Sequence, residues 1–161
     1  IVRSTAGRLA RDVQLKLRIA NGLHTAMVYV MALSRMFSTE RCVESGITSY
    51  LEQLFERDIV LLTAELSLAR AEVTPVFSEW MARLQHPHFG LDCFFICQNA
   101  MQKMGIRLLP SVGAALAAGE APSAFMAFSI AAILRFLTPM GEQPRLAESR
   151  PVFRGQLDAR V

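Results

Sequence analysis

Apolar residues recur every three or four positions along most of this chain, which is the spacing of an α-helix with one buried face. The clearest series consists of Val13, Leu17, Ala20, Leu23, Met27, Val30 and Leu33. No segment alternates between apolar and polar positions in the way that a half-buried strand does. The pattern therefore predicts an all-α fold of roughly six helices.

Polar residues placed just before apolar runs predict where the first helices begin. Asp12 is expected to cap a helix that runs to Met36, because its carboxylate can accept a bond from a free amide of the first turn. Ser49 and Glu52 have the spacing of a capping box, which predicts a second long helix. The run FSTERC at 37–42 is expected to separate the two helices.

Prolines and glycines predict the remaining boundaries. Thr74 and Pro75 are expected to begin a helix, with threonine as the cap and proline in the first turn. A single helix is expected to run through the two cysteines of CFFIC and to end at Gly105. Pro110 is expected to begin the next helix, and the apolar run at 124–137 to form the last.

The chain divides into two parts by composition. Residues 1–138 carry the helical pattern and are expected to form one domain, since 161 residues suffice for a core. Residues 139–161 are polar and punctuated by proline and glycine, so we expect a C-terminal extension. The first residues include neither an initiator methionine nor a signal peptide, and we expect a fragment of a longer protein.

Composition and charge narrow the classes of partner. Apolar residues make up 52% of the chain and charged residues 19%, which favours surfaces that cover another domain or a second copy in a homo-oligomer. The net charge of +3 comes from scattered arginines, which argues against a nucleic acid partner. The apolar run at 124–134 is about half as long as a bilayer requires. An odd set of cysteines, Cys42, Cys93 and Cys97, is typical of reduced, buried thiols in a cytoplasmic protein.

The stretch KLRIANGLH, residues 16–24, places three polar side chains in an otherwise apolar helix. At about 100° per residue, Asn21 lies about 140° from Lys16, with His24 about 80° from Lys16 and between the two. A buried lysine can act as a general base, and an asparagine amide can donate to a carbonyl oxygen that gains negative charge. The three residues therefore fit redox chemistry on an alcohol, or else they are ordinary polar positions of a core helix.

Two details of this stretch bear on whether it is a redox site or an ordinary core helix. Lys16 is one of two lysines among 17 basic residues, and arginine could not replace it as a proton acceptor. Gly22 costs a helix about 1 kcal/mol relative to alanine. A glycine at this point would remove a side chain where a flat ligand could approach.

The same stretch closely resembles the Lys-x(4)-Asn-Gly-x-His helix of the polyol-specific long-chain dehydrogenases, the family of the mannitol dehydrogenases and the tagaturonate and fructuronate reductases. RLQHP at 83–87 resembles the family's Arg-Phe-x-Asn-Pro. The segment at 94–112 is similar to its Lys-x-x-x-Arg-x-Leu-Pro segment, and the segment at 127–137 to a later helix. The resemblance runs from about residue 12 to 138.

The resemblance implies the helical C-terminal substrate domain of that family, which is like the C-terminal domain of 6-phosphogluconate dehydrogenase. It implies that Lys16 is the catalytic acid/base and that Asn21 polarises the substrate carbonyl. It likewise implies that His24 orients the substrate and that Lys103 binds it. The implied reaction is hydride transfer between a sugar alcohol such as mannitol and its ketose, or the hexonate and hexuronate equivalents, with NAD or NADP.

The chain also departs from the family. It has no G-x-G-x-x-G and no β-α-β pattern, so the Rossmann domain is expected outside these residues and the isolated chain is expected to be inactive. His86 replaces the usual asparagine, and Gly90 and Leu91 stand where many members carry a polar pair, which leaves sugar recognition open. The pair His86 and His88 predicts a turn, not a metal site. The alternative function is a non-catalytic helical interaction or oligomerisation module that keeps the family scaffold.

Overall fold

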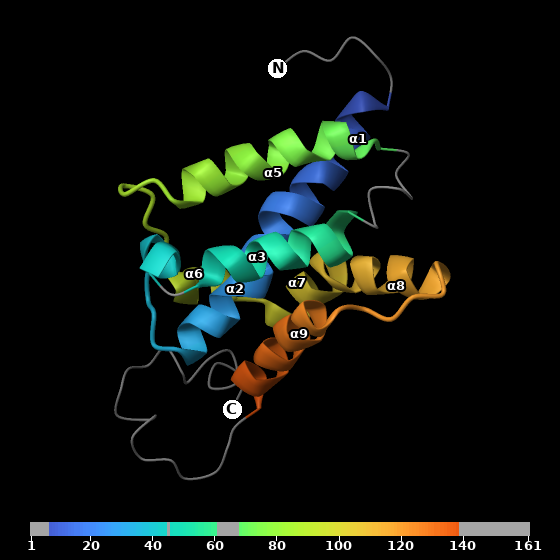
Figure 1. The fold of residues 1–161 in the computed structure, drawn as a ribbon. Helices are drawn as coiled ribbons and strands as arrows, with labels where there is room; N and C mark the ends of the chain where they lie inside the picture. The colour runs from blue at the N-terminus through green and yellow to red at the C-terminus, as the bar shows by residue number, and fades with distance from the viewer. Residues whose placement is uncertain (1–6, 45, 61–67, 139–161) are drawn as a thin grey trace.

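The computed structural model describes residues 7–44, 46–60 and 68–138, which form an all-α fold as predicted (Figure 1). Its α-helices are α1 (Arg8–Lys16), α2 (Gly22–Leu33), α3 (Ile47–Leu54), α5 (Arg70–Leu84), α6 (Cys93–Cys97), α7 (Ala100–Arg107), α8 (Leu109–Ala117) and α9 (Ala124–Leu137). The π-helical segments η1 (Leu17–Asn21) and η3 (Phe55–Ile59) and the 3-10 helix η2 (Thr39–Glu44) join them. Within the described ranges, extended pairing is limited to an isolated bridge between Ser38 and Asp92.

Helix α2 lies at the centre of the fold and packs most extensively against α9 and α6. Its side chains are apolar on nearly every face, so neighbouring helices must cover it all round. Its buried residues are Gly22, Leu23, Thr25, Ala26, Met27, Val28, Tyr29, Met31 and Ala32. The Tyr29 hydroxyl donates to the Cys97 carbonyl at 2.8 Å, which fixes the end of α6 on α2.

The helices α1 and α2 form one continuous run, which the π-helical turn η1 interrupts. The prediction of a single long helix is confirmed in outline, but Asp12 does not cap it, and it ends at Leu33 instead of Met36. The run begins at Arg8 after Gly7, whose φ of 81° favours glycine. A π-helical turn accommodates one extra residue, so the arc from Lys16 to His24 differs from that of a regular α-helix.

Helix α3 begins at Ile47, after Gly46 in the left-handed region with a φ of 72°. The predicted capping box of Ser49 and Glu52 is wrong, because both residues lie inside this helix. The run FSTERC does separate the first two long helices, and most of it forms η2.

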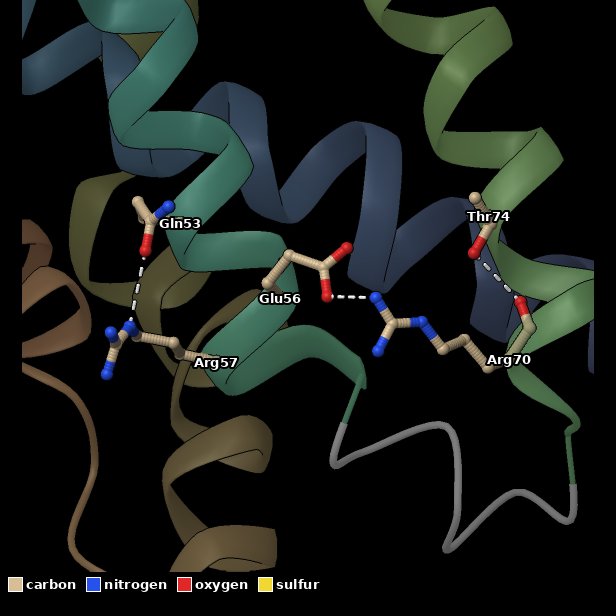
Figure 2. A network of polar contacts seen from close by, with 5 residues as sticks. All are labelled: Gln53, Glu56, Arg57, Arg70 and Thr74. Atoms are coloured by element: carbon tan, nitrogen blue, oxygen red, sulfur yellow. Dashed lines mark hydrogen bonds and ion pairs between the residues drawn. The ribbon is translucent and has the colours of Figure 1, made fainter.

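Helix α5 starts at Arg70, so the predicted start at Thr74 and Pro75 is wrong. Figure 2 shows the contacts near this start: the Arg70 guanidinium pairs with the Glu56 carboxylate of η3, and the Thr74 hydroxyl donates to the Arg70 carbonyl at 3.0 Å. Thr74 therefore bonds back to the preceding turn, as threonine does inside helices. The Glu56 pair joins η3 to α5, although both side chains are too exposed for it to add much stability.

The segment η3 also supports the start of α9. The Asp58 carboxylate is buried, and it accepts hydrogen bonds from the backbone N–H of Ser123, at 2.9 Å, and from the Ser123 hydroxyl. The same hydroxyl accepts from the amides of Phe125 and Met126 at 3.1 and 3.3 Å. Ser123 is thus the N-cap of α9, and the predicted last helix is confirmed over 124–137.

The predicted single helix through CFFIC is interrupted, because α6 ends at Cys97 and α7 begins at Ala100. Asn99, between them, has a φ of 57°, a left-handed conformation that asparagine adopts more readily than most residues. Gly105 does not end the second helix but lies inside it. Pro110 stands in the first turn of α8, as predicted.

Three further expectations concern the whole chain. Cys42, Cys93 and Cys97 are buried thiols in the reduced form, as predicted. Among the described residues, no helix combines the length and the apolar character needed to cross a membrane. The predicted C-terminal extension, residues 139–161, lies outside the residues that the structure describes.

Candidate functional site

A pocket of about 320 Å³ lies between the start of α2 and the segment that carries α6 and α7. Its walls consist of Asn21, His24, Leu91, Phe95, Ile96, Gln98, Asn99, Lys103 and Arg107. Three of the four residues expected at a site, Asn21, His24 and Lys103, therefore lie around one pocket. Lys16 is not among its lining residues and is exposed at the last position of α1.

Asn21 ends the π-helical turn, and Thr25 fixes its backbone. The buried Thr25 hydroxyl donates to the Asn21 carbonyl at 2.8 Å and accepts from Nη1 of Arg107 at 3.0 Å. One hydroxyl thus connects the two walls of the pocket. Within the described residues, nothing hydrogen-bonds the side-chain amide of Asn21, which leaves this amide available to a ligand.

His24 presents an uncharged ring to the pocket. Its Nε2 is buried without a hydrogen-bond partner among the described residues, and its ring packs against Trp80 at 5.1 Å between centroids and 77° between planes. Burial, together with the positive charges of Arg107 and Arg83, lowers the pKa of His24 to about 4. The imidazole is therefore neutral near pH 7, and it can accept or donate a hydrogen bond without carrying charge.

Lys103 and Arg107 form a cationic wall, because residues four apart share a face of α7. The Lys103 ammonium donates to the Ile96 carbonyl at 2.6 Å, and burial and the nearby Arg107 lower the pKa of this lysine. The Arg107 guanidinium is held by Thr25. No acidic side chain is among the residues that line the pocket, so its potential favours an anionic group.

The sequence suggested that Gly22 leaves space for a ligand, but the structure fills this space with backbone atoms. A Cβ at this position would lie 3.3 Å from the Arg107 carbonyl and 3.4 Å from the Leu17 carbonyl. The Arg18 guanidinium donates to the Ile106 carbonyl beside it. The absent side chain therefore allows the end of α7, which carries Arg107, to approach η1, which carries Asn21.

Sequence reasoning missed Arg107, Gln98 and Asn99 as pocket residues. A signal for Arg107 was present, because it lies four residues after Lys103 and helical spacing puts both on one face. The pair His86 and His88 lies in an exposed turn with ring centroids 5.6 Å apart. The described residues hold no group of three or more His, Cys, Asp or Glu side chains that could bind a metal.

A family model and several curated relatives match this chain. The family model of the mannitol dehydrogenase C-terminal domain matches residues 12–153. Altronate oxidoreductases of Escherichia coli (strain K12) and of Escherichia coli O157:H7 (strain EC4115 / EHEC) are each 28% identical to the chain over 122 residues. The match covers 75% of this chain and 25% of each relative, so the chain spans about a quarter of their length. No solved structure gives a significant match.

Proposed function

Because this chain belongs to the mannitol dehydrogenase family through its C-terminal domain, we propose that it is the substrate-binding and catalytic half of an NAD(P)-dependent hexonate or polyol dehydrogenase. The observation that carries the proposal is the pocket that Asn21, His24 and Lys103 share. These are residues of three different chemistries, and the resemblance implies each of them at a substrate site.

The nicotinamide cofactor supplies or accepts the hydride when it is bound. The described residues contain no strand and hence no Rossmann turn that could hold its diphosphate. The pocket offers donors and cations suited to an oxygen-rich substrate. In this proposal the domain contributes the substrate side of the site, and NAD or NADP is held by a part of the protein outside these 161 residues.

Each residue then has one role. The Lys16 amine takes the hydroxyl proton during oxidation and returns it during reduction. The free amide of Asn21 donates to the substrate oxygen as that oxygen gains negative charge. The neutral His24 ring holds a neighbouring hydroxyl. Lys16 is exposed in this chain, so the proposal requires that another part of the whole enzyme cover it during turnover.

The cationic wall favours a hexonate over a neutral sugar alcohol. Arginine binds carboxylates with two parallel hydrogen bonds, and Thr25 already holds the Arg107 guanidinium in place. Lys103 adds a second cation, with no acidic residue in the lining to offset it. The relatives named altronate oxidoreductase point to the same substrate class.

A kinetic comparison tests the proposal. The full-length protein that contains this domain is assayed with D-altronate, D-mannitol and mannitol 1-phosphate, each with NAD⁺ and NADP⁺. We expect the highest kcat/KM with altronate. Arg107→Gln should lower kcat/KM for altronate by about 10- to 100-fold, the size expected when a hydrogen bond to a charged group is lost. The same change should affect mannitol much less.

Arg57→Gln is the matched control, because Arg57 is an exposed arginine of η3 outside the pocket. Preference for mannitol over altronate would contradict the hexonate assignment alone. Absence of turnover and of binding with all three substrates would overturn the enzyme proposal. The non-catalytic interaction module would then be the better explanation.

A further inference from the structure

We propose that Trp80 is a positioning residue of this site, which holds the His24 ring in the pocket wall and keeps water from the buried edge of the imidazole. The indole packs edge-to-face on the imidazole, with 5.1 Å between centroids, and only 4% of Trp80 is exposed. The inference rests on the proposed function, in which His24 orients the substrate.

A row of aromatic rings prevents the indole from moving away. Phe77 lies one turn earlier on α5, and its ring centroid is 6.3 Å from that of Trp80. Phe77 is in turn stacked on Phe55 of η3, with 4.0 Å between the ring centroids and 6° between the ring planes. The row therefore runs from η3 through α5 to His24 on α2. Close-packed aromatic side chains have few alternative rotamers, so the row presses the indole against the imidazole.

Packing is the contact that fixes the imidazole. Within the described residues, no hydrogen bond reaches the His24 ring, and its Nε2 is buried without a partner. Nε1 of Trp80 is also buried, and no residue that the structure describes bonds to it. An unsatisfied indole N–H is costly, and a phenylalanine would fill much of the same space without that cost. The indole therefore contributes its shape beside the imidazole and not a hydrogen bond.

The charges around His24 all oppose its protonation. Arg83 comes from α5, and Lys103 and Arg107 come from α7. Arg18 of η1 is turned toward the Ile106 carbonyl. The lining of the pocket holds no acidic residue that would offset these cations. If water entered beside the ring, it would solvate an imidazolium and screen these charges, so His24 would gain a proton at higher pH.

The first test follows the ring protons of His24 by NMR during a pH titration of the 161-residue chain. Assignment uses His24→Gln, since the chain has three histidines. In the unmodified chain, we expect His24 to titrate near pH 4. Trp80→Leu should raise the midpoint toward about 6.5, the value of a solvated histidine. Trp80→Phe should leave it near pH 4, because a phenyl ring still covers the imidazole.

Phe77→Leu is the matched control, because it removes an aromatic ring of the same row that touches Trp80. Because the indole stays in place but loses support from the row, we expect lower stability and a smaller rise in the His24 midpoint than in Trp80→Leu. An unchanged midpoint in Trp80→Leu, or an equal shift in Phe77→Leu, would overturn the proposal. Since this readout does not involve turnover, it stands apart from any failure of the proposed function.

Fluorescence provides a second measurement, which needs no Trp80 variant to fold. Trp80 is the sole tryptophan of the chain, and a protonated imidazole in contact with an indole quenches its emission. Emission should fall with a midpoint near pH 4 in the unmodified chain, and this step should be absent in His24→Gln. The proposal would be overturned if emission fell in the same way in the unmodified chain and in His24→Gln. It would also be overturned if emission stayed constant while NMR reported protonation of His24, since the two rings would then not be in contact.

Discussion

The π-helical segments η1 and η3 share a backbone irregularity, but their polar side chains differ in what they bind. In η1, the Asn21 amide lines a pocket, and no hydrogen bond within the described residues holds it. In η3, the buried Asp58 carboxylate accepts two hydrogen bonds from Ser123 at the start of α9. A π-helical turn is therefore not a sign of a binding site by itself. The sign is a polar group that the fold positions and leaves without a partner.

This difference implies that changes near η1 should reduce function more than they reduce stability. Changes in η3 should do the opposite. Substitutions in and beside the two segments can test this difference.

The largest expected effect is that of Lys16, which directly precedes η1. In the full-length enzyme, Lys16→Ala should lower kcat by about 10²–10⁴-fold, the usual contribution of a positioned acid/base. Substrate binding should weaken much less. Lys16→Arg should not restore turnover, because arginine keeps its proton at working pH. Steady-state kinetics with the hexonate measure both effects.

An added amine provides a second measurement on Lys16→Ala. Recovery of the rate should follow the concentration of the free-base form of the amine, since that form takes up the proton. Arg57→Ala, on the exposed side of η3, should leave kcat unchanged. Near-normal turnover in Lys16→Ala or in Lys16→Arg would reduce Lys16 to a structural role.

The next effect concerns Asp58 in η3. Asp58→Ala leaves the N–H of Ser123 without its acceptor and should lower the free energy of unfolding by about 1.5–3 kcal/mol, the value of hydrogen bonds to charged groups. Denaturation in urea measures this loss. Asp58→Asn keeps one acceptor oxygen and should lose less. A fall in kcat per folded molecule in Asp58→Ala would contradict the division between the two segments.

A smaller effect is expected at Gly22, where η1 meets α7. Gly22→Ala places a Cβ 3.3 Å from the Arg107 carbonyl, so a backbone must shift. We expect a loss of about 1–2 kcal/mol in stability, typical of an overpacked contact, and a higher KM for the hexonate. Gly105→Ala is the matched control, since nothing lies within 4 Å of its added Cβ. It should stabilise α7 by about 1 kcal/mol. Equal effects of the two alanines would show that the contact with η1 is unimportant.

The smallest expected effect is that of Thr25. Thr25→Val keeps the shape of the side chain but removes the hydroxyl that joins Asn21 to Arg107. Stability should fall by about 1 kcal/mol, and the KM for the hexonate should rise more than kcat falls. Thr25→Ser keeps the hydroxyl and should behave as the unmodified protein does. Urea denaturation and steady-state kinetics of both variants show whether the Thr25 hydroxyl supports stability and substrate binding.

Local sequence signals predicted some helix boundaries and misplaced others. Pro110 stands in the first turn of α8, and α9 covers the apolar run at 124–137, both as expected. Asp12, Ser49 and Thr74 have the residue type and spacing of helix caps but lie inside helices. At Thr74 the reason is that a hydroxyl can donate to the carbonyl of the preceding turn as well as accept from a free amide. The residue type alone does not distinguish these two situations.

The pocket was predicted in part. Helical spacing and the motif indicated Asn21 and His24, and the family resemblance indicated Lys103; all three line one pocket. The role of Arg107 depends on a hydrogen bond to Thr25, 82 residues earlier in the chain. The left-handed Asn99 between α6 and α7 is likewise invisible to an apolar pattern that continues across it. Contacts of this range arise only when distant helices pack together, so periodicity could not predict them.

The break at Asn99 gives the two walls of the pocket different freedom to change during evolution. The α2 wall is embedded in the core, so most substitutions there would disturb the whole fold. The opposite wall is built from two short helices, and Phe95 and Gln98 on it are exposed. Under the proposed function, substrate range can diverge through such surface positions while the reacting residues stay fixed. A directed-evolution library restricted to these positions should therefore alter sugar preference with few losses from misfolding.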